Sequence, residues 1–103
     1  MNSIERHIEI TPGVRGGKPR LAGSRITVDD IVVMHLRLGQ SLPEIVGRYD
    51  LDPAAVYAAM AYYYDHRDEI DRLIEADRVY AEAFQRGDPS LLQEKMRALR
   101  GAS

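Results

Sequence analysis

Residues 41–53 have the sequence Ser-Leu-Pro-Glu-Ile-Val-Gly-Arg-Tyr-Asp-Leu-Asp-Pro, and this stretch contains two helix starts. Ser41, followed three residues later by Glu44, forms a capping box in which each residue satisfies a backbone amide of the other. Asp52 before Pro53 is a second start, because aspartate accepts from first-turn amides and proline in the first turn loses no hydrogen bond. The first of these helices can therefore extend only to about residue 49. We predict two helices joined by a short turn.

Another helix is predicted before this stretch. Thr27 can cap it, and the acidic pair Asp29 and Asp30 suits the positive end of its dipole. Gly39 suits its C-terminal end. Apolar residues recur between these limits at helical spacing: Ile31, Val32, Met34, Leu36 and Leu38. Three consecutive helices with short turns predict a trihelical helix-turn-helix domain over residues 28–68, although an ordinary three-helix bundle fits the same helix lengths.

The N-terminal segment, residues 1–27, is predicted to form a short β-arm. Residues 8–10 and 25–28 alternate between apolar and polar side chains, as half-buried strands do, and glycine and proline are frequent between them. The predicted fold is therefore mainly α, with a trihelical core, this β-arm and a helical C-terminal extension.

The C-terminal extension, residues 69–103, is predicted to form a long helix that ends at Gly87 and a short helix that starts at Asp88. The long helix is acidic and has an apolar stripe, which we expect to bind a partner protein: Ile70, Leu73, Ile74, Tyr80 and Phe84. Folding of this stripe back onto the helical domain is the alternative.

Charge is distributed unevenly along the chain, although the formal net charge is only -2. Residues 1–28 contain five Lys or Arg against two Glu, whereas residues 41–103 contain eight Lys or Arg against twelve Asp or Glu. Such a basic head on an acidic tail suggests two different partners. Four cations of the arm are candidate contacts to DNA phosphates: Arg15, Lys18, Arg20 and Arg25. For Arg25 the alternative is a structural bridge to Asp29 or Asp30.

The helix that begins at Pro53 has an outward face that we predict to consist of Ala54, Ala58, Ala61 and Tyr62. None of these is one of the Arg, Lys, Asn or Gln side chains that read base edges. Small uncharged residues let two backbones approach closely, so this face is predicted to pack on a second subunit as a dimer interface.

No enzymatic site is expected. The chain has no cysteine, and its three histidines, His7, His35 and His66, are too far apart in sequence for metal-ligand spacing. The sequence Gly16-Gly17-Lys18 is followed by Pro19 where a phosphate-binding loop has Ser or Thr. We therefore expect no metal and no cofactor. The N-terminus lacks the apolar segment of a signal peptide, and no apolar run approaches the roughly 20 residues that span a bilayer, so we expect a cytoplasmic protein.

Residues 10–28, Ile-Thr-Pro-Gly-Val-Arg-Gly-Gly-Lys-Pro-Arg-Leu-Ala-Gly-Ser-Arg-Ile-Thr-Val, resemble the opening of a bacterial and archaeal family. That family is catalogued as domain of unknown function four-thirty-three and is treated as VapB-type antitoxins. Its opening has a Gly-Gly-Lys-Pro turn and then Gly-Thr-Arg-Ile-Pro-Val. This chain has Ser24 and Thr27 where threonine and proline are usual. The resemblance continues through residues 39–45, 51–59 and 62–71, and thus covers roughly residues 8–72.

The resemblance implies a homeodomain-like helix-turn-helix protein that is usually dimeric and is encoded beside a PIN-like ribonuclease toxin. The expected function is that of an antitoxin: a homodimer that binds operator DNA through the arm and covers the toxin with the helices after residue 68. A protein-only adaptor without DNA binding is the rival hypothesis, and an RNA-binding regulator is a third.

Overall fold

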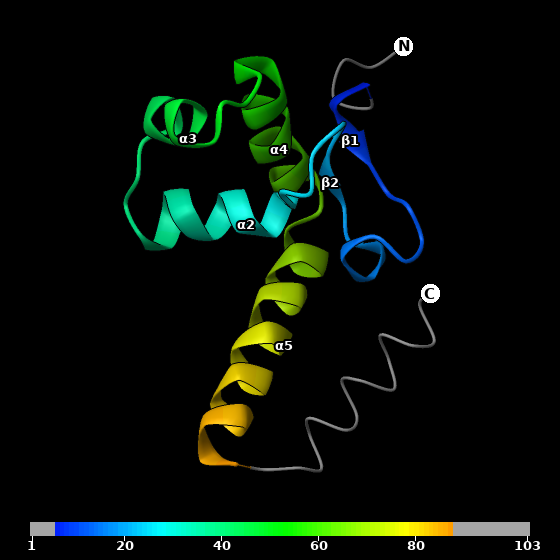
Figure 1. The fold of residues 1–103 in the computed structure, drawn as a ribbon, viewed down its shortest axis with the longest axis vertical. Coiled ribbons are helices and arrows are strands. Elements are labelled where there is room, and N and C mark those ends of the chain that lie inside the picture. Colours follow the sequence, from blue (N-terminus) through cyan, green and yellow to red (C-terminus); the bar gives the residue numbers. More distant parts are fainter. Residues whose placement is uncertain (1–5, 88–103) are drawn as a thin grey trace.

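The computed structural model describes residues 6–87, which form a mainly helical domain with a small two-stranded sheet (Figure 1). In chain order the elements are β1 (Ile8–Glu9), η1 (Arg15–Gly17), β2 (Arg20–Leu21), α2 (Val28–Val32), η2 (Val33–Arg37), α3 (Leu42–Tyr49), α4 (Pro53–Asp65) and α5 (Arg67–Arg86). The short helix predicted to start at Asp88 lies outside the described residues. Among residues 6–87 no helix is both long enough and apolar enough to cross a membrane.

The predicted first helix is present, but its two halves are wound differently. Thr27 caps α2: its Oγ1 accepts from the Asp30 amide at 3.1 Å, and Asp30 Oδ2 accepts from the Thr27 amide at 3.1 Å. The chain then continues into η2, a π-helical turn that is closed by a hydrogen bond from the Leu38 amide to the Val33 carbonyl. Gly39 follows with a φ of 74°, which glycine adopts without strain.

Both helix starts within residues 41–53 are confirmed. Ser41 Oγ accepts a hydrogen bond from the Glu44 amide at 3.1 Å, and Glu44 Oε1 accepts one from the Ser41 amide at 3.3 Å. Asp52 Oδ1 accepts from the Ala54 amide at 2.9 Å, at the start of α4. Between the two helices Asp50 adopts the left-handed conformation that ends α3.

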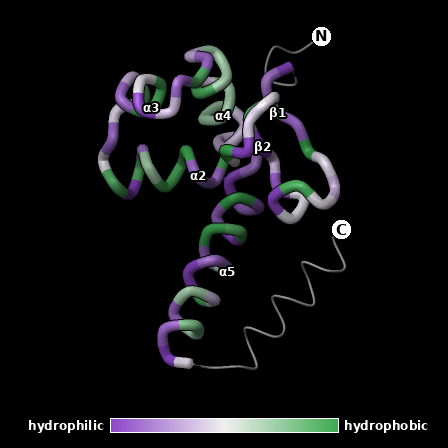
Figure 2. The backbone as a smooth tube through the Cα atoms, viewed as in Figure 1, coloured by the Kyte–Doolittle hydropathy of each residue, from purple (hydrophilic) through white to green (hydrophobic). Residues whose placement is uncertain are grey.

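A single hydrophobic core lies among α2, α3, α4, β2 and the first half of α5. Ile31, Ile45, Val56 and Ile70, one from each of the four helices, are completely buried. Hydrophobic and hydrophilic residues alternate along α5 in Figure 2, as expected for a helix with one face on the core. The far end of α5 projects away from the other helices (Figure 1).

The strand prediction was wrong in one respect. β1 pairs antiparallel with β2, with Ile8 opposite Leu21 and Glu9 opposite Arg20, whereas residues 25–28 form no strand. Thr27 makes only an isolated bridge to Arg20, through bonds from the Leu21 amide to the Ile26 carbonyl and from the Val28 amide to the Pro19 carbonyl. The pairing stops there because α2 begins at Val28.

Candidate functional site

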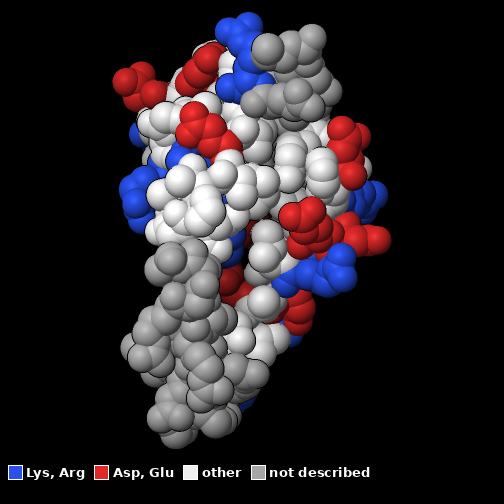
Figure 3. All heavy atoms as spheres, turned by 90° about the vertical axis from the view of Figure 1, so that its right-hand side faces the viewer, with Lys and Arg blue, Asp and Glu red and all other residues white. Residues whose placement is uncertain are grey.

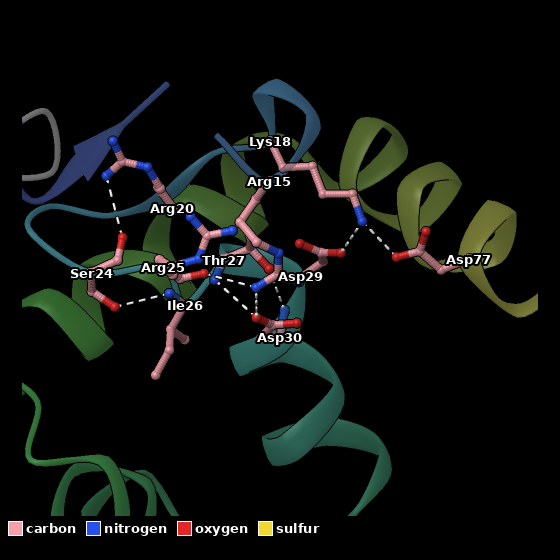
Figure 4. A network of polar contacts seen from close by, with 10 residues as sticks. All are labelled: Arg15, Lys18, Arg20, Ser24, Arg25, Ile26, Thr27, Asp29, Asp30 and Asp77. Carbon is pink, nitrogen blue, oxygen red and sulfur yellow. Dashed lines mark hydrogen bonds and ion pairs between the residues drawn. The ribbon is translucent and has the colours of Figure 1, made fainter. Parts of the chain in front are cut away.

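Lys18 in the arm connects three parts of the fold. Its Nζ lies 3.2 Å from Asp29 Oδ2 on α2 and 2.5 Å from Asp77 Oδ2 on α5 (Figure 4). The side chain of Asp29 is only 5% exposed and that of Lys18 18%. Burial alone lowers the pKa of Lys18, but hydrogen bonds and charges from Asp77 and Asp29 outweigh it, so the pKa lies above its ordinary value. Lys18 therefore stays charged and is part of an internal ionic link.

Two of the predicted DNA-binding arginines are also engaged internally. Arg20, itself buried, donates to Glu9 Oε2 at 2.8 Å and to Thr11 Oγ1 at 2.9 Å. Arg15 donates to Asp30 Oδ2 at 3.1 Å and to the Arg25 carbonyl at 2.8 Å. The bonds of Arg20 hold the arm against β1, and those of Arg15, seen in Figure 4, hold it against the start of α2. The N–H donors that make these internal bonds are not available to a phosphate.

The assignment of Arg15, Lys18, Arg20 and Arg25 as phosphate-binding residues stays a prediction, and the structure adds that Arg15, Lys18 and Arg20 are engaged in internal bonds. Of the four, only Arg25 has an exposed side chain. The carboxylates of Asp29 and Asp30, proposed above as alternative partners of Arg25, bond Lys18 and Arg15 instead. Where the face drawn in Figure 3 is not grey, Lys and Arg are interspersed with Asp and Glu and form no continuous basic surface.

The outward face of α4 differs from the predicted one. Ala58 is buried, and Tyr62 is half-buried and stacked on His66 with ring centroids 4.0 Å apart. The exposed residues of α4 are Pro53, Ala54, Tyr57, Tyr64 and Asp65. Of the four predicted interface residues only Ala54 is exposed, because Ala61 is half-buried like Tyr62. The helical spacing was visible in the sequence, but the rotation of α4 against the core was not.

The predicted partner-binding stripe of α5 is divided between core and surface. Ile70 and Ile74 are buried in the core cluster and Leu73 packs against it, so these three residues stabilise the domain itself. Tyr80 is half-buried, and Phe84 is 67% exposed. The first half of α5 therefore belongs to the helical domain rather than to a separate extension that starts at residue 69.

The sequence profile of a family described as "Protein of unknown function (DUF433)" matches residues 8–63 of the chain, from β1 to the last turns of α4. The chain belongs to the DUF433 family. It is also similar to the crystal structure of a DUF433 member protein from Anabaena variabilis, with 34% sequence identity and a TM-score of 0.62. That similarity covers 70% of this chain and 71% of the other. No curated protein matches the chain.

This DUF433 chain also has a groove of about 550 Å³ between the first helix and α5. Apolar side chains from η2, α3, α5 and the loop before α2 line much of it: Ile26, Val33, Met34, Tyr49 and Ile74. The π-helical turn η2 contributes Val33 and Met34, and π-turns occur often at functional positions. Among the described residues of this DUF433 protein, no group of His, Cys, Asp and Glu is arranged to hold a metal ion.

Proposed function

We propose that this protein is an antitoxin that acts through protein contacts: it forms a homodimer and neutralises a PIN-like ribonuclease by covering it. The observation that supports this is the exposure of large aromatic side chains on a domain whose core is already filled. Tyr57 is 55% exposed, Tyr64 57% and Phe84 67%. Tyr57 and Tyr64 are seven residues apart and share one face of α4, and exposed apolar side chains that lie together mark interaction surfaces. The resemblance of residues 8–72 to VapB-type antitoxins supports this class of partner.

In this proposal α3 and α4 correspond to the two helices of a homeodomain-like helix-turn-helix motif. The helix that would enter the DNA groove, α4, exposes Pro53, Ala54, Tyr57, Tyr64 and Asp65, and it has no Arg, Lys, Asn or Gln to read base edges. Tight operator binding through α4 or through Lys18 and Arg20 is therefore not expected. Weak binding that depends on Arg25 and other exposed arginines is expected, with a shallower salt dependence than three or four phosphate contacts would give.

The test is inhibition of the ribonuclease. The full chain is mixed with a purified PIN-like ribonuclease, the partner class that the family resemblance implies, and RNA cleavage is measured with increasing amounts of the chain. We expect stoichiometric inhibition that Phe84→Ala weakens about tenfold, since loss of an interface aromatic anchor costs 1–2 kcal/mol or more. Leu38→Ala is the control, because Leu38 is equally exposed (64%) but lies on another element.

The protein-only adaptor is the second candidate, and the internal bonds of the arm cations favour it because they leave little charge for DNA. Stable binding to the PIN-like protein without any inhibition of RNA cleavage would identify an adaptor. Absence of both binding and inhibition would refute the antitoxin proposal.

A further inference from the structure

Two faces of α5 are buried, and only one of them packs on the core. Ile70 and Ile74 belong to the core cluster. Ala83 is also completely buried, but it is not part of that cluster. It follows Ile74 by nine residues, which places it about 180° around the helix and about 13.5 Å further along. A second buried face is therefore present towards the end of α5, on the side opposite Ile74.

This second face is apolar and short. Val79 and Tyr80, four and three residues before Ala83, lie on the same side of the helix and are half-buried. We call these three residues the distal face of α5. Ala76, which precedes Tyr80 by four residues, is exposed. The cover therefore lies over about the last two turns of α5 and does not continue to Ala76.

The helices that pack on α5 do not reach the distal face. α2 and α4 pack on α5 at the turns that hold Ile70 and Ile74, whereas the far end of α5 projects away from them (Figure 1). The turns of one helix leave the outward side of an alanine open to water, so complete burial of Ala83 requires atoms from another segment. Because Ala83 is buried within one copy of the chain, that segment belongs to the same copy.

We infer that residues 88–103 fold back on α5 and cover its distal face as the second helix of an antiparallel pair. Gly87, with a φ of 73°, ends α5, and Asp88 followed by Pro89 is a helix start. Two helices joined by two to five residues form an antiparallel hairpin. Residues 1–5 span at most about 17 Å and are attached near β1, at the opposite end of the long axis (Figure 1), so they are too far away.

This inference goes beyond the proposed function and does not depend on it. It concerns how the C-terminal residues pack within one copy of the chain, whether or not that copy inhibits a ribonuclease.

The spacing of apolar residues after α5 agrees with this pairing. With a rise of about 1.5 Å per residue, Ala83 lies about 6 Å and Tyr80 about 10.5 Å before the glycine that ends α5. In a helix that starts at Pro89 and runs back along α5, Leu92 lies about 4.5 Å and Met96 about 10.5 Å from the start. Leu92 and Met96 are four residues apart and thus share one face. The pair therefore sets Leu92 opposite Ala83, and Met96 opposite Tyr80.

The charges of the two segments are complementary. α5 contains six Asp or Glu against four Arg, whereas residues 90–103 contain three Lys or Arg against one Glu. Opposite net charges on adjacent helices attract each other, although solvent keeps the contribution of each exposed pair small. The C-terminal segment therefore matches α5 in charge as well as in apolar spacing.

The inference changes which part of the C-terminal region is open to a partner. The sequence alone predicts that residues 69–103 are a partner-binding extension, whereas here residues 88–103 cover their own domain. Phe84 follows Ala83 by one residue, about 100° around the helix, and is 67% exposed. The cover thus leaves Phe84 accessible to a partner.

Thiol accessibility in the full chain tests the cover, because the chain has no cysteine of its own. The thiol of Ala83→Cys should react with N-ethylmaleimide at least about tenfold more slowly than that of Ala81→Cys, since Ala81 is exposed on the same helix. Addition of Leu92→Asp and Met96→Asp to Ala83→Cys should remove this protection. Leu99→Asp is the matched control and should leave the protection intact, because Leu99 lies beyond the covered turns in the proposed pair.

Three results would overturn the inference. Equal reaction rates for Ala83→Cys and Ala81→Cys would mean that the distal face has no cover. Protection that survives Leu92→Asp with Met96→Asp would mean that another segment supplies the cover, and loss of protection with Leu99→Asp as well would refute the stated pairing.

A disulfide tests whether the cover belongs to the same copy, and it does not depend on how well Ala83→Cys folds. In Tyr80→Cys with Met96→Cys the two thiols face each other, so mild oxidation of a dilute solution should close a disulfide within one chain. Leu38→Cys with Met96→Cys is the control that should not close, since Leu38 is exposed on another element. Covalent dimers in place of closed monomers would assign the cover to a second copy, and no disulfide, or equal closure of both double variants, would refute the pair. Neither experiment contains the ribonuclease, so failure of the antitoxin proposal leaves both results unchanged.

Discussion

Replacement of Lys18 distinguishes an internal structural role from a DNA-contacting one. Lys18 binds a nearly buried carboxylate, Asp29, whose other oxygen, Oδ1, is buried without a hydrogen-bond partner. Lys18→Met keeps the length and the apolar stem of the side chain and removes only its charge. Asp29 is then left as an uncompensated charge inside the domain.

The expected loss of stability follows from how exposed the two ion pairs of Lys18 are, the one with Asp29 and the one with Asp77. Removal of one partner from a buried ion pair costs about 3–5 kcal/mol, which applies to Lys18 and Asp29 at 18% and 5% exposure. Asp77 is 43% exposed, so solvent reduces its contribution to at most about 1 kcal/mol. We expect a loss of roughly 3–4 kcal/mol in the free energy of unfolding. For a domain of this size, that corresponds to a fall in Tm of roughly 15–30 °C.

Urea and thermal unfolding followed by circular dichroism measure this loss. The double variant Lys18→Met with Asp29→Asn also removes the uncompensated negative charge of Asp29. We therefore expect it to be more stable than Lys18→Met alone by at least about 1 kcal/mol. If Lys18→Met lowers stability by less than about 1 kcal/mol, the ionic link is not a structural element. A phosphate-contacting lysine would instead show unchanged Tm and weaker DNA binding.

Three other predictions follow from the same structure. Ile70→Ala should cost about 2–5 kcal/mol in urea unfolding because it opens a cavity in the core, whereas Phe84→Ala should change stability by less than about 0.5 kcal/mol because Phe84 is exposed; equal effects would mean that α5 is not divided as described. Thr27→Ala should cost about 1 kcal/mol by removing the cap that Thr27 shares with Asp30, and an unchanged urea midpoint would contradict this. The folded-state pKa of Lys18 lies above 10.5, so its stabilising contribution is complete below pH 10.5 and is lost as the pH rises through the folded pKa. The stability difference between wild type and Lys18→Met should accordingly shrink as the pH rises above 10.5, and a difference that grows with pH would contradict the assignment.

Local chemistry explains why the helix boundaries were predictable from the sequence. The caps at Thr27, Ser41 and Asp52 each use a side chain and an amide within three residues, so no distant part of the chain is needed to form them. The same holds for Gly87, whose φ of 73° ends α5. Membership of the DUF433 family was likewise confirmed, because the resemblance to that family rests on a contiguous string of residues.

The candidate interaction residues were less predictable. The sequence shows that residues 10–28 are basic, but it does not show that Lys18 meets Asp77, which is 59 residues further along the chain. It also places Ala58 and Tyr57 on neighbouring sides of α4 without indicating which side faces Ile31 and Ile45. A difference of one residue in helix rotation, about 100°, decides which of the two is exposed.

The amino-acid sequence by itself thus determined where the helices begin and end, since caps, glycines and helical periodicity act over a few residues. Only the tertiary structure decided which charges are available and which apolar faces remain open. Charge pairing and burial depend on residues that are distant in the chain and become neighbours only when α2, α4, α5 and the arm pack together.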